Sequence, residues 1–319
     1  IKKLSFFFLL TSLIFAFLLF KPSSYRSVDT VFFPRGINLS QISNILLKNN
    51  VIESAFFFKL VALSLKLDKK VKAGEYLFEN KTSLYNTFKK INSGDHYFRK
   101  FVVIEGTTTE KVINDLNANL YLSGKINKKI EEGTLFPETY FFLRNDNREK
   151  LLLRMQEKMH ETIDGIWSSK KSFIDSKEKL IKLASLIEAE TKLNSEKYIV
   201  SSVFHNRIKL NMRLQSDPTV LYAKNLNNKK KNRKIYKNDL KKDSPWNTYT
   251  NKGLPLTPIC NPGLVSLKAA ANPALTDYVY FVSDGNNGHL FSTNIDQHNK
   301  NVNIFRKIMN KKANEKKAN

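Results

Sequence analysis

The sequence has almost none of the residues from which disulfide frameworks and the common cofactor sites are built. Cys260 is the single cysteine, so an intramolecular disulfide is excluded and the redox compartment is left open. The five histidines are scattered, with no His-Glu-x-x-His motif and no Cys/His ligand spacing. No glycine-rich dinucleotide loop or Walker-type loop is present, and no base is evident beside Cys260. We therefore expect no metal, no other cofactor and no thiol nucleophile.

Acidic residues are also few. There are 29 of them against 53 basic residues, and the resulting formal charge of +24 favours anionic surroundings such as nucleic acid, anionic lipid or an acidic polymer. Residues 224–242 are rich in lysine and asparagine. A nucleic-acid surface would need interleaved aromatic residues or a recognised motif, and Tyr236 stands alone in this stretch. We interpret it as a solvated loop and expect no nucleic-acid partner.

The longest apolar run lies at the start of the chain. Residues 4–20 are polar only at Ser5, Thr11 and Ser12, and the length of this run is at the short end for crossing a bilayer. Two lysines ahead of it predict a cytoplasmic N-terminus and export of everything that follows. A cleaved signal peptide is the alternative, but residues 21–24 offer no Ala-x-Ala-like cleavage site. We therefore predict a retained transmembrane anchor at residues 1–21.

The next part of the chain predicts a small unit of mixed strands and helices. Hydrophobic periodicity and capping residues give strands at 31–33 and 74–78, and helices at 39–46, 54–67 and 83–91. A strand at 101–105 and a helix opened by Thr109 repeat the pattern about 70 residues later. Such short pieces resemble the LysM glycan-binding module, and a generic α+β spacer fits the pattern equally well. We assign residues 25–130 to a LysM-like region.

The remaining residues predict a second domain at 131–310, followed by a basic disordered tail at 311–319. Helical periodicity covers 150–166, the segment around 183–191, 195–209 and 264–271, and a closing helix begins at Asp296. Residues 278–282 and 289–292 read as a strand pair around a glycine-rich turn. The chain as a whole is expected to be α+β, with an anchor, a LysM-like subdomain and a mixed α+β catalytic domain.

Two glutamates in the segment 183–191 fall within an apolar helical arc. At about 100° per residue, Glu188 lies between Ala184 and Ile181, and Glu190 lies near the other edge of the same arc. A buried carboxylate must find partners or keep its proton, and a carboxylic acid that keeps its proton near neutral pH suits general-acid catalysis. A helix-edge residue that reaches solvent is the alternative reading.

Polar residues gather after the following helix in a way that a plain core does not require. They form three groups, Asn206 with Arg207, Gln215 with Asp217, and Asn247 with Tyr249. Asp217 precedes a proline, so it is a candidate helix cap as well as a candidate for binding a substrate.

Several of these blocks together resemble one known family, the endolytic murein transglycosylases, also called the MltG or YceG-like family. Their order and spacing match from the anchor to about residue 308. Leu256 and Thr257 depart from the Pro-Gly usual in the family, and the insert after Lys224 is unusually basic. The matching blocks are residues 183–191 (Leu-Ala-Ser-Leu-Ile-Glu-Ala-Glu-Thr), 203–207, 214–219, 247–249, 253–255, 261–263 and 280–282, with 288–289 and 298–299.

The resemblance implies a lytic transglycosylase that cleaves between N-acetylmuramic acid and N-acetylglucosamine in nascent strands, leaves 1,6-anhydro ends and terminates elongation. It implies that Glu188, the first glutamate of its block, is catalytic. Glu190 lies roughly 160° away on the helix, so the two cannot easily flank one bond as in a hydrolase. We interpret Glu190, Asn206 and Arg207 as supporting residues. The predicted substrate-binding residues are Gln215, Asp217, Asn247 and Tyr249.

The same resemblance implies peptidoglycan strands as the partner and the bacterial cytoplasmic membrane as the location, with a single anchor and the catalytic domain on the outer side. Peptidoglycan synthases are open candidates as further partners. The alternative is a membrane-anchored peptidoglycan-binding protein without catalysis, which turnover of purified peptidoglycan would distinguish.

Overall fold

The computed structural model describes residues 2–23, 30–66, 71–226 and 234–318, and in it the chain forms two compact units. The first contains Ile1–Phe101 and Phe141–Asp146, and the second contains Val102–Tyr140 and Asn147–Asn319. The predicted α+β class is confirmed. The predicted domain boundary at 130/131 differs from this division, because residues 102–130 pack with the second unit and a short later segment returns to the first.

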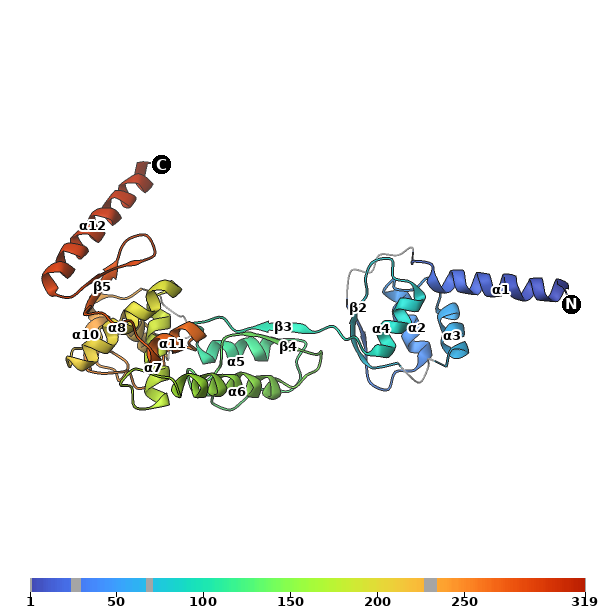
Figure 1. The fold of residues 1–319 in the computed structure, drawn as a ribbon, viewed down its shortest axis with the longest axis horizontal. Coiled ribbons are helices and arrows are strands. Elements are labelled where there is room, and N and C mark those ends of the chain that lie inside the picture. Colours follow the sequence, from blue (N-terminus) through green and yellow to red (C-terminus); the bar gives the residue numbers. More distant parts are fainter. Residues whose placement is uncertain (1, 24–29, 67–70, 227–233, 319) are drawn as a thin grey trace. The chain divides into compact units, whose positions relative to one another are not determined.

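The first unit contains an apolar helix and a small set of alternating strands and helices (Figure 1). Strand β1 pairs with β2 in antiparallel fashion, with Thr30 opposite Leu77. Strand β3 pairs with β4, which is Thr139–Phe142. The elements are α1 (Lys2–Phe20), β1 (Thr30–Phe33), α2 (Leu39–Lys48), α3 (Ala55–Ser64), β2 (Gly74–Leu77), α4 (Leu84–Ser93) and β3 (Arg99–Val102).

Local sequence signals explain where the helices of this unit begin. The side chains of Asn38, Ser54 and Ser83 each accept a hydrogen bond from the backbone N–H three residues later, so each occupies the N-cap position that its residue type favours. Helix α3 ends at Ser64, earlier than the predicted 67. The order β1–α2–α3–β2 is compatible with the LysM-like assignment, which stays a prediction.

The core of the first unit is aromatic and includes part of α1. Phe33, Phe58 and Tyr76 are fully buried, and Leu19 of α1 is buried with them. Burial of each such side chain contributes about 1.5–3 kcal/mol. Within the described residues, Lys3–Phe20 is the segment that is long and apolar enough to cross a membrane.

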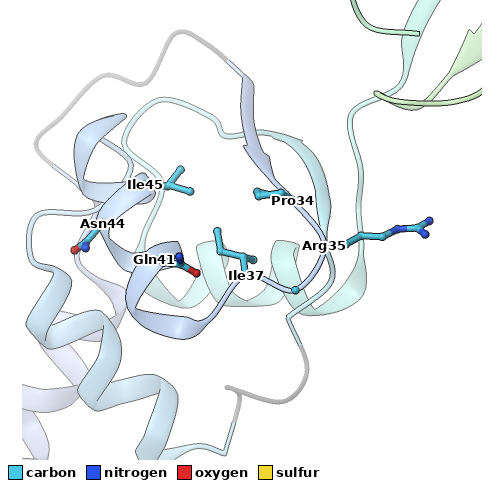
Figure 2. Close-up of a pocket in the computed structure, with 7 residues that line it drawn as sticks. Pro34, Arg35, Ile37, Gln41, Asn44 and Ile45 are labelled. Atoms are coloured by element: carbon cyan, nitrogen blue, oxygen red, sulfur yellow. The ribbon is translucent and has the colours of Figure 1, made fainter. Parts of the chain in front are cut away.

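An open pocket lies on the first unit, between the turn after β1 and helix α2 (Figure 2). Its volume is about 480 Å³. Apolar and polar side chains alternate around it, with the amides of Gln41 and Asn44 on α2 beside Ile45. The lining residues are Pro34, Arg35, Gly36, Ile37, Gln41, Asn44 and Ile45.

The second unit is mainly helical and is built around α7. Helix α7 packs against both α8 and α11, and Leu183, Ile187, Phe204 and Leu267 are fully buried between them. The elements after β4 are α6 (Arg148–Trp167), α7 (Lys177–Glu190), α8 (Asn194–Lys209), α9 (Asp217–Asn225), α10 (Lys237–Lys241), α11 (Leu264–Ala271), β5 (Tyr280–Ser283), β6 (His289–Ser292) and α12 (Ile295–Ala318), and α5 (Thr109–Ala118) precedes β4.

In two segments of this unit the structure differs from the expectation. The tail predicted to be disordered continues α12 as far as Ala318, because no proline or glycine interrupts the helix there. The basic insert predicted to be a loop contains the short helix α10, closed by an ion pair of 2.6 Å between Lys224 and Asp239. The centre of the insert, residues 227–233, lies outside the described residues.

Candidate active site

Glu188 lies in the last turns of α7 and is buried, with 8% of its surface exposed. Its two carboxylate oxygens accept hydrogen bonds from the ammonium of Lys197 at 3.0 and 3.1 Å. One of them also accepts from the backbone N–H of Gly263 at 3.0 Å and from the hydroxyl of Ser266 at 2.7 Å. Lys197 itself is only 1% exposed. Glu188 is therefore the nearer counter-charge of a buried ammonium.

A second carboxylate completes the surroundings of Lys197. Glu105, in the loop before α5, lies 3.7 Å from the Lys197 ammonium and is about half exposed. Gly263 leaves room for the Glu105 carboxylate, which would have to move if residue 263 carried a Cβ atom. This network links the loop before α5, α7, α8 and the start of α11.

Glu190 lies at the end of α7 in a different environment. Its carboxyl accepts one hydrogen bond, from the hydroxyl of Ser216 at 3.0 Å. Burial raises the pKa of Glu190 to about 7, and the charge of Asp217 adds to that rise, while Ser216 and Arg207 lower the pKa by less. Glu190 therefore exchanges its proton near neutral pH, which is the property a general acid and base needs.

Arg207 organises the segment that faces Glu190. The guanidinium is buried and donates to the carbonyl oxygens of Val279 at 2.6 Å and Leu214 at 2.8 Å. It also lies over the ring of Tyr280, 5.3 Å from the centroid. Asn206 donates to the carbonyl oxygens of two residues just before β5. Asn206 and Arg207 thus connect the end of α8 to the segment before β5, and their supporting roles stay a prediction.

Three of the residues predicted to bind substrate lie around Glu190. Gln215 is exposed, has a left-handed backbone with φ of 50°, and accepts from Arg207 at 3.4 Å. Asp217 is exposed and accepts a hydrogen bond of 2.5 Å from the hydroxyl of Tyr249. Ser216 occupies the N-cap position of α9, so the alternative reading of Asp217 as the cap is not the one observed.

The fourth predicted substrate residue has a different environment. Asn247 is 1% exposed. Its side-chain nitrogen donates to the carbonyl oxygens of Leu240 and Lys242, and its side-chain oxygen accepts from the N–H of Tyr249 at 2.8 Å. Because both polar atoms are occupied inside the loop, Asn247 holds Tyr249 in place and is not available to a ligand. The substrate-binding role predicted for Asn247 therefore has no support from its surroundings.

The sequence did not lead us to Lys197 and Ser216. These two residues are the hydrogen-bond donors that make the surroundings of Glu188 and Glu190 different. Lys197 carries a signal that could have found it, because it lies on the same face of α8 as Val200 and Phe204. A lysine on a buried helical stripe requires a carboxylate partner. Ser216 gives no comparable signal. Among the described residues there is no group of three or more histidine, cysteine, aspartate or glutamate side chains that could hold a metal ion.

The sequence that carries this site matches one protein family along most of its length. That family is the YceG-like family, and the match covers residues 31–304 of this chain. The chain belongs to the YceG-like family. The family resemblance predicted from the sequence is confirmed.

Two relatives of this YceG-like chain carry the name of an enzyme. The endolytic murein transglycosylase of Bacillus subtilis (strain 168) is 34% identical over 299 residues, which cover 84% of this chain and 82% of the relative. That of Streptococcus pneumoniae serotype 2 (strain D39 / NCTC 7466) is 26% identical over 325 residues, covering 86% of this chain and 57% of the relative. A solved structure of a yceG-like protein from Listeria monocytogenes matches 85% of this chain and 98% of its own, with a TM-score of 0.54 and 30% identity.

Proposed function

We propose that this YceG-like protein is an endolytic murein transglycosylase, a lytic enzyme that cleaves peptidoglycan strands internally and so ends their elongation. The names of its relatives support the activity. The observation that carries the chemistry is Glu190, a carboxyl group with a pKa of about 7 at the edge of an exposed group of polar side chains.

We assign the general acid to Glu190 in preference to Glu188, the residue that the family resemblance implies. Glu188 is held in four hydrogen bonds, two of them from the buried ammonium of Lys197, so both of its carboxylate oxygens are engaged inside the protein. Glu190 has a single hydrogen bond and is next to exposed residues that could face a sugar. The exposed neighbours are Gln215 and Asp217, with the half-buried Tyr249 bonded to Asp217.

In the proposed reaction, Glu190 gives its proton to the oxygen that joins C1 of N-acetylmuramic acid to N-acetylglucosamine. The bond between C1 and that oxygen breaks, and its electron pair stays on the oxygen. The 6-hydroxyl of the same muramic acid then forms a bond to C1 and returns its proton to the Glu190 carboxylate. No water is consumed, and the products are a free N-acetylglucosamine hydroxyl and a 1,6-anhydro-N-acetylmuramic acid end. An internal nucleophile has a high effective molarity, so no positioned water is required.

The neighbours of Glu190 have supporting roles in this reaction. The negative charge of Asp217 helps to keep Glu190 protonated before the cleavage step. The same charge can stabilise the positive charge that develops at C1 as the bond breaks. Tyr249 fixes the Asp217 carboxylate through its hydroxyl, and Arg207 fixes the loop that carries Gln215 and Ser216.

Hydrolysis is a second candidate, because Asp217 gives the site a second carboxylate that acts on Glu190. A hydrolase uses such a pair to protonate the leaving group and to activate water or form a covalent intermediate. Product masses separate the two reactions. Lytic transfer yields ends that are one water lighter than hydrolytic ends, and a substrate without a free 6-hydroxyl should resist it. Reducing ends that take up heavy oxygen from water would establish hydrolysis.

The anchor belongs to the same proposal. We infer that α1 is retained as a single transmembrane helix with the rest of the chain on the outer side of the cytoplasmic membrane. Leu19 lies in the core of the first unit, and the backbone N–H of Ser23 donates to Thr82 at 3.1 Å. Removal of the helix would uncover part of that core, which supports an anchor over a cleaved signal peptide.

Two isosteric substitutions test the assignment of the acid. Glu190→Gln should reduce turnover of purified peptidoglycan by about 10²–10⁴-fold, because the amide has no proton to give, and should leave the fold intact. Glu188→Gln should lower the melting temperature and retain measurable turnover per folded molecule. A folded, inactive Glu188→Gln together with an active Glu190→Gln would return the role to Glu188. Full turnover in both variants would contradict the assignment of the acid to either glutamate. No turnover of the unmodified protein would favour a purely glycan-binding protein.

A further inference from the structure

Helix α3 of the first unit exposes an apolar stripe on the protein surface. Phe56, Leu60 and Leu63 are spaced for one helical face and are 74%, 44% and 60% exposed. Phe58, Val61 and Ala62 form the opposite face and are completely buried. Helix α3 is therefore apolar on both sides, although only one side packs against the core.

The exposed stripe of α3 adjoins α1. Phe57, which lies next to the stripe on the helical wheel, contacts Phe15 of α1 with ring centroids 6.0 Å apart. At the start of α3, Glu53 forms an ion pair of 3.4 Å with Lys21, the first residue after α1. Figure 1 draws α3 beside α1 at the same end of the unit.

The position of Phe15 within α1 determines how deep α3 lies in the bilayer. Phe15 lies five residues before the end of α1, which corresponds to about 7 Å along a helix that rises 1.5 Å per residue. A helix of this length is no longer than the hydrocarbon core, so its last apolar residue lies at or within the boundary of that core. If α1 spans the bilayer, Phe57 must lie within the acyl chains together with Phe15.

We propose that α3 is an interfacial membrane helix, and that its stripe of Phe56, Leu60 and Leu63 is buried among the lipid acyl chains of the leaflet at the C-terminal end of α1. This inference rests on the proposed anchor. Amphipathic helices in bilayer interfaces bury their apolar face about 5–10 Å deep, which agrees with the depth set by Phe15. Lys59 and Lys66, at the side and the end of the stripe, can extend their ammonium groups to the phosphates.

A neighbouring aromatic pair fits the same placement. Tyr85 of α4 is 44% exposed and contacts Phe20, the last residue of α1, with ring centroids 5.0 Å apart. Tyrosine with an apolar ring and a polar hydroxyl is enriched at the level where hydrocarbon meets headgroups. The membrane would thus hold the first unit through two helices and not through a flexible tether.

Site-directed labelling of the full chain in lipid nanodiscs tests this placement. A polarity-sensitive fluorophore is attached to Leu60→Cys, Ile14→Cys or Arg35→Cys, and quenching by lipids with acyl-chain nitroxides is compared with quenching by a water-soluble agent. Cys260 is buried, and the unmodified chain measures any background from it. The three positions are exposed in the protein, so each variant should fold.

We expect the label at Leu60 to be quenched by the lipid nitroxides as strongly as the label at Ile14, and the label at Arg35 to be quenched only from water. Lipid quenching at Ile14 with only aqueous quenching at Leu60 would overturn the placement of α3 and leave the anchor in place. Aqueous quenching at both Ile14 and Leu60 would overturn the anchor and, with it, this inference.

Discussion

Glu190 has an unusual pKa for a carboxyl group, and the pH dependence of catalysis should reveal it. Turnover by the protonated acid should be full below pH 7 and fall about tenfold for each pH unit above it. Because the charge of Asp217 helps to raise the pKa, Asp217→Asn should move this fall to lower pH. A pH–rate profile of kcat/KM on purified peptidoglycan measures both. A profile that is flat up to pH 9 would contradict the role of Glu190.

The raised pKa of Glu190 should also make the free energy of unfolding depend on pH. The pKa of Glu190 is raised from 4.5 to about 7 in the folded state, so the folded state binds the proton more tightly than the unfolded state. Stability should therefore decrease as pH rises from 4.5 to 7 and then level off. Glu190→Gln should remove that part of the decrease when denaturation midpoints are compared across this pH range.

The pair of Glu188 and Lys197 should act mainly on stability. Glu188→Gln leaves the ammonium of Lys197 buried with only the more distant Glu105, and we expect a loss of about 3–5 kcal/mol in the free energy of unfolding. Adding Lys197→Met should restore part of this loss, because no buried charge then remains. Chemical denaturation measures both variants.

Glu178→Gln serves as the matched control, since Glu178 is exposed and pairs with Lys182 one turn later in the same helix. The control should leave the denaturation midpoint almost unchanged. Equal stability of Glu188→Gln and the control, with loss of turnover only in Glu188→Gln, would contradict a structural role for the pair.

At the scale of elements, Asn261 holds together segments that are far apart in sequence. The side chain is fully buried, accepts from the N–H of Leu135 at 2.9 Å and donates to the carbonyl of Thr107 at 2.9 Å. It thereby connects the loop before α11 to the loops on both sides of α5. Asn261→Ala should cost about 2–4 kcal/mol, because it leaves buried backbone groups without partners.

The exposed Asn251 provides the comparison for this substitution. Its side chain donates to Ser244 and Asn247 in solvent-accessible positions, where water can replace the lost bonds. Asn251→Ala should cost less than about 0.5 kcal/mol. Similar unfolding midpoints for the two variants would show that Asn261 does not connect these loops in solution.

The elements also show what the sequence could and could not predict. Helix starts at Asn38, Ser54 and Ser83 were predictable, because a cap depends on residues three positions apart. The wheel placed both glutamates of α7 inside, and both are at least partly buried. It could not show that Glu188 accepts hydrogen bonds from Lys197 on another helix while Glu190 accepts one from Ser216, because these pairings join residues that the helical periodicity of one segment does not relate.

At the scale of the whole molecule, the property to measure is membrane topology, that is, the side of the membrane on which each end of the chain lies. With α1 as a retained anchor and its N-terminus in the cytoplasm, a reporter fused after Asn319 should behave as exported. The lysines ahead of α1 provide the physical reason. Cytoplasmic reporter activity would contradict the orientation. A mature chain that begins near residue 24 would contradict the retained anchor.

The return of residues 141–146 to the first unit has a consequence for the newly made protein. Arg144 forms an ion pair of 3.3 Å with the fully buried Glu75 and lies over the ring of Phe32. Since a chain emerges from the ribosome N-terminus first, the unit that begins at the anchor is still incomplete when Phe101 has appeared. It must wait for 43 further residues (144 minus 101) before Arg144 has been made. During that interval Glu75 has its ion pair with Arg99 but lacks the one with Arg144, and the nascent chain is open to chaperones and proteases.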